Sequence, residues 1–388
     1  MSQVPDPGVL AQRLRDARKQ AGLTQEAVAG DLGIPRTSVV AIERGERRVQ
    51  PPELVRLAEL YGRQLHELVR PTVGVQDFVA QFRIALQRAP ESEDLDSLVR
   101  ELQELTEDYL ALEKATGSLL QKHYPTPYPV DMATPEQSAE DIATRERGRL
   151  GLGDGPLLQL REILESDVGL RIFSMKMPSS VAALFAYSDD AGGCLAFNSE
   201  QPFERQRMSI AHEYEHFLTR RHRPEITVLP TYRRVPAEER AANAFAASFL
   251  MPASGLVRRF NDLKAARGGV PTPSDLLRLA HLYQVSFQAL MVRLEDMKLV
   301  PSGRWDQLAV SGFRVQDARQ LIGLPQLPPD NELLPVRYRY LAIEAFEKGR
   351  ITEGQLSRFL RVDRLTARSV VGQAISEWAG AEAVDRLP

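Results

Sequence analysis

The most informative stretch of the chain is the run AHEYEHFL at residues 211–218. On an α-helix, residues four apart share a face, so His212 and His216 can both reach one metal ion. Paired imidazoles are common zinc ligands, with metal–nitrogen distances of about 2.0–2.1 Å. Glu213 is rotated away from the ligand direction, and we predict that it is the catalytic residue, a base that takes a proton from zinc-bound water.

A catalytic zinc site needs a third protein ligand and keeps one position for water. Pro236 opens a second predicted helix that carries two candidates, Glu238 and Glu239, followed by several alanines. The small alanines would let this helix pack close to the histidine helix. Spacing alone does not choose between the two glutamates.

These residues, taken together, resemble the ImmA/IrrE family of metallopeptidases, which looks like a reduced gluzincin. The resemblance is carried by Arg205-Gln206-Arg207, by Ala211 to His216, and by Glu239, Ala242, Asn243, Phe245, Ala246, Phe249, Leu250, Met251 and Pro252. It implies an α+β zinc metallopeptidase domain over residues 138–300, with Glu239 as the third ligand and Glu238 as the alternative. It also implies that residues 195–198 form an edge strand, which would bind an extended substrate by β-addition.

The chain departs from the family pattern inside the motif, where Tyr214 and Glu215 replace an aliphatic residue and a glycine. Glu215 could disturb the site or form a solvated salt bridge. The oxyanion of the transition state needs a donor besides zinc. The candidates for this donor are Tyr232, Arg233 and His222, for each of which solvated surface is the competing interpretation.

Short β-prone runs precede the motif at residues 171–173, 184–187 and 195–198, separated by the turn cluster Ser-Asp-Asp-Ala-Gly-Gly. Helical signals dominate the remainder. We therefore predict a mainly α protein with a small β-sheet.

The first 72 residues have the pattern of a helix-turn-helix. Thr24 is a suitable N-cap for a helix that ends at Gly33, and Pro35 suits the first turn of the next helix. Two short helices joined by a tight glycine-containing turn define this arrangement. The start of its second helix faces base edges.

This stretch resembles the Xre/Cro-type repressor family. The resemblance is carried by Leu14-Arg15, Gly22-Leu23-Thr24-Gln25, Ala29, Gly33-Ile34, Ile42-Glu43-Arg44-Gly45 and residues 54–60. We predict a DNA-binding domain over residues 1–72 that reads a double-stranded operator. Its predicted contacts are Gln25, Arg36, Thr37, Ser38, Arg44 and Arg47, and a helical protein-interaction module is the alternative.

The chain has 388 residues and a net charge of −3, which on its face argues against nucleic-acid binding. This net charge is the sum of a basic segment and an acidic segment. Residues 8–72 carry eleven basic and eight acidic side chains, whereas residues 91–114 carry nine acidic and two basic ones. A single cysteine, Cys194, excludes a disulfide scaffold and favours a reducing, cytoplasmic location. No apolar run of about 18 residues is present, so we expect no membrane span.

Three further segments are expected. Residues 73–123 form a helical linker with a short heptad seam that lies on a neighbouring domain or pairs two copies in a homodimer. Residues 124–137 form a proline-rich extended linker. Residues 301–388 form a helical region in which Arg361-Val362-Asp363 makes the turn of a second helix-turn-helix, for DNA or for docking.

The resemblances imply a transcriptional regulator with a zinc-dependent endopeptidase, which cleaves a repressor or itself in response to a stress, prophage or defence signal. The alternative is a DNA-binding repressor or antitoxin-like regulator whose peptidase-fold domain is a non-catalytic sensor.

Overall fold

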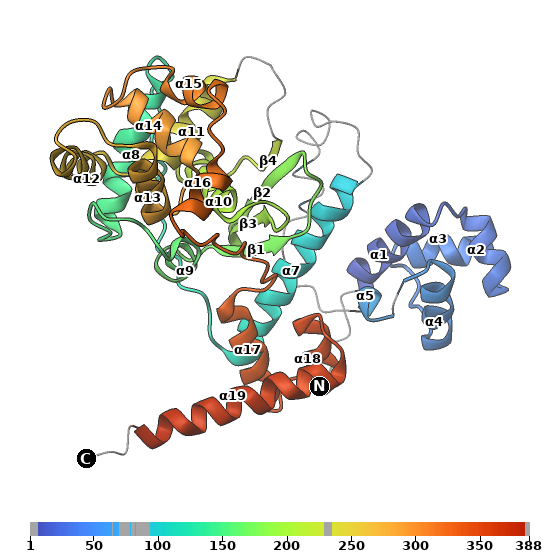
Figure 1. Cartoon of the computed structure of the whole chain (residues 1–388). Helices are drawn as coiled ribbons and strands as arrows, with labels where there is room; N and C mark the ends of the chain where they lie inside the picture. Colours follow the sequence, from blue (N-terminus) through green and yellow to red (C-terminus); the bar gives the residue numbers. More distant parts are fainter. Residues whose placement is uncertain are drawn as a thin grey trace. The chain divides into compact units, whose positions relative to one another are not determined.

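A computed structural model of the chain describes residues 7–63, 65–69, 78, 82, 94–228 and 235–384. The chain divides into two compact units, Met1–Val75 and Gln76–Pro388, each with its own interior. Helices predominate and one small sheet is present, which confirms the predicted fold class (Figure 1).

In the residues that the structure describes, the first unit contains five helices that pack together. They are α1 (Pro7–Gln20), α2 (Gln25–Leu32), α3 (Arg36–Glu43), α4 (Pro51–Leu60) and α5 (Leu65–Val69). Leu14, Val28 and Leu57 lie in their shared apolar core. The Thr24 hydroxyl accepts from the N–H of Ala27 and begins α2, and Gly33 ends it at φ +64°, which a glycine adopts without strain. The predicted helix-turn-helix is therefore present as α2 and α3.

The second unit is built around a four-stranded mixed sheet. Its strands are β1 (Arg171–Met175), β2 (Val181–Ser188), β3 (Gly192–Asn198) and β4 (Glu225–Val228), in the order β1-β3-β2-β4. β1 runs parallel to β3, and β2 pairs antiparallel with both β3 and β4. The three strands expected from the sequence are confirmed. The expectation of an edge strand at residues 195–198 is wrong, because β3 lies between β1 and β2 and both sides of its backbone are hydrogen-bonded.

Each face of the sheet packs on a helix. Side chains alternate between the two faces of a strand. Ile172 and Leu195 belong to the core that includes α10 (Phe203–Arg220). On the opposite face, the ring of Phe173 meets the edge of Tyr109 on α7 (Asp94–Thr116). This double burial explains why the strands are almost uniformly apolar.

Helices on the α10 side complete the fold around the metal motif. They are α8 (Pro135–Arg149), α9 (Leu160–Ile163), the π-helical turn η1 (Leu164–Val168), α11 (Ala237–Leu250), α12 (Ala253–Ala266), α13 (Pro273–Tyr283) and α14 (Phe287–Asp296). α11 packs on both α8 and α10. The motif is thus carried by a helix that is held between the sheet and other helices.

The acidic helix α7 is not a free surface. The heptad residues Leu98, Leu102 and Leu105 are buried, and α7 packs on β3 and on α17 (Val336–Glu347). At its end, the Glu113 carboxylate pairs with Arg171 on β1 at 2.8 Å and with Arg337 on α17 at 2.8 Å. Leu86 and Pro90, which the sequence placed in the same helical segment, lie outside the described residues.

The proline-dense segment expected as an extended linker is fixed to the second unit. The Tyr124 hydroxyl donates to the carbonyl of Gly169 at 2.8 Å, and the Tyr128 N–H donates to the carbonyl of Leu218 at 2.9 Å. The segment has neither helix nor strand, as expected, until α8 begins at Pro135. It is therefore an extended segment that is hydrogen-bonded to the second unit through Tyr124 and Tyr128, and not a free linker.

The C-terminal region adds α15 (Arg304–Val310), α16 (Val315–Leu321), α17, α18 (Glu353–Leu360) and α19 (Arg364–Val384). The segment between α16 and α17 runs along β1. There, the Ser174 N–H donates to the carbonyl of Leu333 at 3.2 Å, and the Ser174 hydroxyl donates to the carbonyl of Asp330 at 2.7 Å. The outer edge of β1 is thereby covered. Among the described residues, no helix has the length and apolarity needed to cross a membrane.

Candidate metal centre

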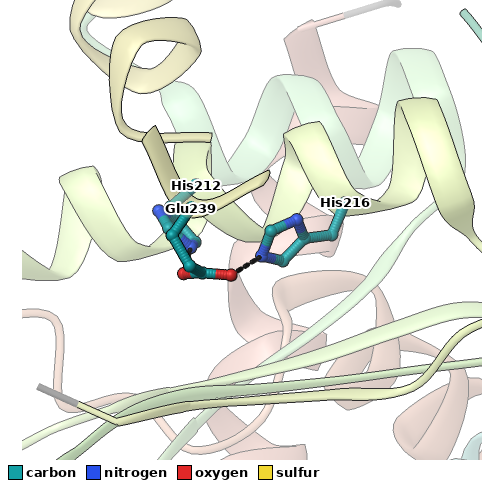
Figure 2. Close-up of side chains that lie close together, drawn as sticks. All are labelled: His212, His216 and Glu239. Atoms are coloured by element: carbon teal, nitrogen blue, oxygen red, sulfur yellow. Dashed lines mark ion pairs between the residues drawn. The ribbon is translucent and has the colours of Figure 1, made fainter. Parts of the chain in front are cut away.

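Two neighbouring helices bring three potential metal ligands together. His212 and His216 lie one turn apart on α10, and Glu239 lies in the first turn of α11. Nε2 of His212 is 3.3 Å from Oε2 of Glu239, and Nε2 of His216 is 3.8 Å from Oε1 of the same carboxylate. One ligand atom from each residue lies within 4.8 Å of the others, and Figure 2 shows the three side chains converging.

The close approach of α11 to α10 depends on small side chains. Ala241, Ala242 and Ala246 are all buried on α11. This contact leaves Glu239 facing the histidines. Glu238 instead pairs with Arg220 at 2.5 Å and with Arg223 at 3.2 Å. The geometry therefore places Glu239, and not Glu238, beside the two imidazoles.

Each imidazole is held through its other nitrogen. Nδ1 of His212 is 3.1 Å from Oδ1 of Asn243, and Nδ1 of His216 is 2.9 Å from Oε2 of Glu215. With a metal ion on the two Nε2 atoms, the Nδ1 atoms would carry the protons and donate to these oxygens. Such partners fix the tautomer and orientation of histidine ligands in metal sites. Glu215 is buried beside His216, so the expectation of a solvated salt bridge is wrong.

Arg220, one turn after His216, is a cation at the rim of the centre. Its Nη2 lies 2.8 Å from Nδ1 of His216 and 3.6 Å from Oε1 of Glu239. Burial raises the pKa of Glu215 to about 7, although Arg220 opposes this. Burial also opposes ionisation of Glu239, but the two histidines outweigh it and lower the pKa of that carboxyl to about 2. Glu239 is thus an anion under ordinary conditions.

Glu213 lies on the same helix as the histidines and is fully buried. Its Oε1 accepts a hydrogen bond from the Thr227 hydroxyl on β4, whereas its Oε2 has no hydrogen-bond partner among the described residues. Burial raises the pKa of Glu213 to about 8, and His212 and Thr227 reduce this effect. The Glu213 carboxyl is therefore fixed through Oε1, and Oε2 is available to accept a hydrogen bond or a proton.

Tyr214, the other departure from the family pattern, points away from the metal ligands. Its hydroxyl donates to Glu146 on α8, and Nη2 of Arg149 lies 3.5 Å from it. Its ring stacks on Phe217 and packs against Phe249. Tyr214 therefore joins α10 to α8 and leaves the ligand set unchanged.

The donor set fits zinc. Two imidazole nitrogens and one carboxylate make a three-ligand arrangement that leaves a position for water. Nε2 of His212 is buried and has no hydrogen-bond partner within the described part of the chain, so a metal ion would satisfy it. The lone Cys194 lies elsewhere, buried in β3, where burial raises the pKa of its thiol. It is not among the three residues of the cluster.

The three expected oxyanion donors differ in their placement. Tyr232 and Arg233 lie outside the described residues. His222 is exposed just after α10, and its ring meets the ring of Tyr187 at 4.9 Å. The structure therefore gives His222 a surface contact with an aromatic side chain.

The residues expected to contact DNA differ in their exposure and in their partners. Arg36 and Thr37 are exposed at the start of α3, and Ser38 is half-buried. Arg44 is exposed after the same helix, 4.0 Å from Glu46. Arg47 pairs with Glu53 at 2.7 Å.

The side-chain amide of Gln25 donates to Glu43 at 2.9 Å, and Glu43 also pairs with Arg18 at 2.5 Å. One Gln25 N–H is therefore used inside the protein, and the amide retains its second hydrogen for a ligand. A hollow of about 520 Å³ lies beside these groups, lined by Arg18, Leu23, Thr24, Gln25, Glu26 and Arg36.

The sequence did not predict three residues that contact His212, Glu213 or His216, namely Asn243, Thr227 and Arg220. Asn243 stood within the family pattern without an assigned role. Arg220 follows His216 by four residues, which is a helical spacing that could have suggested a contact. Thr227 gave no such signal, since its approach to Glu213 depends on how β4 joins the sheet.

The solved structures that match the chain include two of low sequence identity. The structure of ComR from Streptococcus suis is 11% identical, covers 97% of this chain and 96% of that chain, and has a TM-score of 0.17. The apo form of ComR from S. thermophilus is 11% identical, covers 82% and 95%, and has a TM-score of 0.16. No curated protein matches the chain.

Comparison with protein families assigns two stretches of the sequence. Residues 9–70 match a helix-turn-helix domain. Residues 165–295 match the IrrE N-terminal-like domain of the M78 peptidases. The first match covers α2 and α3, and the second covers the sheet together with α10 and α11.

Proposed function

We propose that this chain, in which a helix-turn-helix DNA-binding domain precedes an IrrE-like peptidase-family domain, is a transcriptional regulator that hydrolyses peptide bonds with the help of zinc. The observation that carries the proposal is the buried carboxyl of Glu213 beside the cluster of His212, His216 and Glu239. A structural metal site would not require such a group.

His212, His216 and Glu239 would hold the ion. When bound, zinc supplies Lewis acidity that polarises a peptide carbonyl and acidifies water. Beside a bound zinc ion, Glu213 would be favoured in its ionised form, which would accept the water proton at Oε2 while Thr227 fixes its other oxygen. Glu213 then delivers this proton to the leaving amine nitrogen, so one carboxyl serves as base and afterwards as acid.

The strand that would align a substrate is β4. Within the described part of the chain it is the last strand in the sheet order, and its Thr227 contacts Glu213. An extended peptide that added to this edge would pass close to the base, and main-chain hydrogen bonds would supply affinity. This role moves from residues 195–198, which lie in the sheet interior, to residues 225–228.

The protein substrate that we propose is a repressor or the chain itself, and the trigger is a stress, prophage or defence signal in the cytoplasm. Arg36 and Thr37 at the start of α3 support operator recognition, because they are exposed where a recognition helix meets base edges. Ser38, Gln25, Arg44 and Arg47 would complete the contact with bases and phosphates.

The test compares the wild type with Glu213→Gln in the presence of Zn²⁺ and candidate repressors, followed by mass spectrometry of the products. We expect the wild type to cleave and the variant to be slower by a factor of about 10²–10⁴, the usual contribution of a general acid–base group. Zinc content, measured by plasma emission, should be equal in the two proteins because all three ligands remain.

A wild type that binds zinc and operator but cleaves nothing, including itself, under inducing conditions would refute the peptidase proposal. That result would favour the alternative, a repressor or antitoxin-like regulator in which the peptidase fold senses a ligand or a partner.

A further inference from the structure

The C-terminal helices α18 and α19 repeat the geometry of α2 and α3. α2 and α18 each have eight residues and begin after a threonine, Thr24 or Thr352, whose hydroxyl accepts from a backbone N–H three residues later. Each helix ends at a left-handed residue, Gly33 or Arg361, and a three-residue turn leads to a helix that begins with arginine. The two arginines are Arg36 and Arg364.

The backbone hydrogen bonds of the two turns are also equivalent. After α2, the Ile34 N–H donates to the carbonyl of Ala29 at 3.1 Å. After α18, the Val362 N–H donates to the carbonyl of Ser357 at 3.1 Å, over the same interval. Arg361 adopts φ +56°, a left-handed conformation that is unfavourable for residues other than glycine. The turn forms in spite of this energetic cost.

Burial follows the same order in both pairs. Val28 and Leu356 are buried at equivalent positions of the first helices, and Val39 and Ala367 are buried at equivalent positions of the second. The residues at the start of α19 are exposed, as at the start of α3. They are Arg364, Leu365, Thr366, Arg368 and Ser369.

The turn alone would not distinguish this pair, because α13 and α14 are joined by a similar one. There, Gln284 is the left-handed residue and α14 begins at Phe287. Phe287 is only 2% exposed and lies in the main core, whereas the next residue, Gln288, is exposed. The start of α14 therefore has no counterpart of the exposed first arginine, Arg36 or Arg364, and this arginine sets α19 apart.

The charge of this region suits a polyanion. Residues 336–384, which hold α17, α18 and α19, carry eight basic and six acidic side chains, a net charge of +2. Arg358 and Arg361 on the α18 side are directed to Asp108 on α7, at 3.3 and 3.8 Å. These ion pairs anchor α18 to the second unit. Arg350, Arg364 and Arg368 remain exposed, the last 2.8 Å from Glu353.

We propose that α18 and α19 form a second DNA-binding helix-turn-helix, in which the start of α19 enters the major groove of duplex DNA. Arg364 and Arg368 would contact phosphates or guanine edges, and Thr366 would contact a base or a phosphate. The exposed Leu365 suits an apolar contact with a thymine methyl group. The chain would then hold one DNA reader in each of its two units.

The test measures binding of the full chain to a mixed-sequence duplex of about 40 base pairs by fluorescence anisotropy, between about 50 and 200 mM KCl, where phosphate contacts dominate. In the double variant Arg364→Ala/Arg368→Ala, we expect the slope of log K against log salt to fall by about 2, because each lost phosphate contact lowers it by roughly 0.9.

Two comparisons separate DNA contact from general effects. Arg304→Ala/Arg314→Ala removes two exposed arginines from α15 and the N-cap of α16, and its slope should equal that of the wild type. Arg364→Lys/Arg368→Lys keeps the positive charges, and its slope should also be retained. Thermal unfolding followed by circular dichroism verifies that all variants are folded.

A slope for Arg364→Ala/Arg368→Ala equal to that of the arginine control would overturn the proposal. So would a loss of self-association or of a protein contact, measured by sedimentation, with an unchanged slope, because α19 would then face protein. The same measurement on Arg36→Ala/Arg44→Ala, alone and combined with the C-terminal pair, should show that each pair lowers the slope independently.

Discussion

Neighbouring glutamates on α11 have separate tasks, and this separation can be tested directly. Glu239 approaches both histidines, whereas Glu238 pairs with Arg220 and Arg223. Glu239→Gln should weaken zinc binding by more than the roughly 10–100-fold that is typical for the loss of an outer partner. Competition with a chromophoric chelator measures this affinity.

Glu238→Gln is the matched control, and its zinc affinity should stay close to that of the wild type. A larger loss in Glu238→Gln than in Glu239→Gln would show that the ligand assignment is wrong.

Glu43 makes the first unit sensitive to acid. Burial disfavours its ionisation, but hydrogen bonds from Arg18 and Gln25 outweigh burial and lower the pKa of this carboxyl below its ordinary value of 4.5. The stabilisation is present above pH 4.5 and is lost as the pH falls through the lowered value. We therefore expect the hydrogen-exchange protection of α1–α3 in the full chain, corrected for intrinsic rates, to decrease when the pH is lowered below 4.5.

Glu43→Gln should show a weaker dependence of protection on pH in that range, and lower protection at neutral pH. An acid response as steep as that of the wild type would mean that other carboxyls control it.

At the scale of single residues, the sequence predicted those contacts that depend on the spacing of residues along one helix. The four-residue interval of His212 and His216 was accessible because it depends on one helix. Spacing left Glu238 and Glu239 open, and the preference for Glu239 came from the family resemblance. The hydrogen bond from Thr227 to Glu213 was not accessible, because it joins a strand and a helix whose contact is set by the whole sheet.

Among the elements, α7 depends on a buried ion-pair cluster. Glu113 is 2% exposed and forms ion pairs with both Arg171 and Arg337. In Glu113→Gln, the buried guanidinium of Arg171 would lose its countercharge, so we expect the free energy of unfolding to fall by about 3–5 kcal/mol. Urea denaturation followed by circular dichroism gives this value.

Glu104→Gln removes a carboxylate from the same helix at a half-buried position, 3.9 Å from Arg361. Its effect should be within about 1 kcal/mol, as is usual for partly solvated pairs. Equal losses in the two variants would exclude a special contribution from the buried cluster.

The sequence predicted the helix-turn-helix and the strands β1, β2 and β3, but not β4 or the order of the strands. Thr24, Gly33 and Pro35 mark helix ends by local chemistry, and the β-prone runs of β1, β2 and β3 are apolar and bounded by turns. β4 has only four residues, and Glu225 and Thr227 alternate with its apolar positions. The interior place of β3 was mispredicted because strand order is a tertiary property that no local pattern contains.

For the whole molecule, the net charge of −3 is the sum of acidic and basic segments. The acidic α7 is partly neutralised inside the second unit by Arg171, Arg337, Arg358 and Arg361. Exposed arginines remain at α3 and at α19. The sequence showed the opposing charges, but not that the C-terminal region supplies the partners of the acidic helix. A homodimer remains a prediction, and the heptad seam itself faces the protein interior.

The segment at residues 330–334 that covers β1 has a consequence for synthesis on the ribosome. β1 emerges about 160 residues before this cover, and synthesis at about 5–20 residues per second leaves its outer edge uncovered by that segment for roughly 8–30 seconds. An open strand edge is a template for pairing with another chain. Nascent chains are therefore expected to depend on chaperones during this interval, and truncation before Asp330 should favour aggregation even though every metal ligand is present.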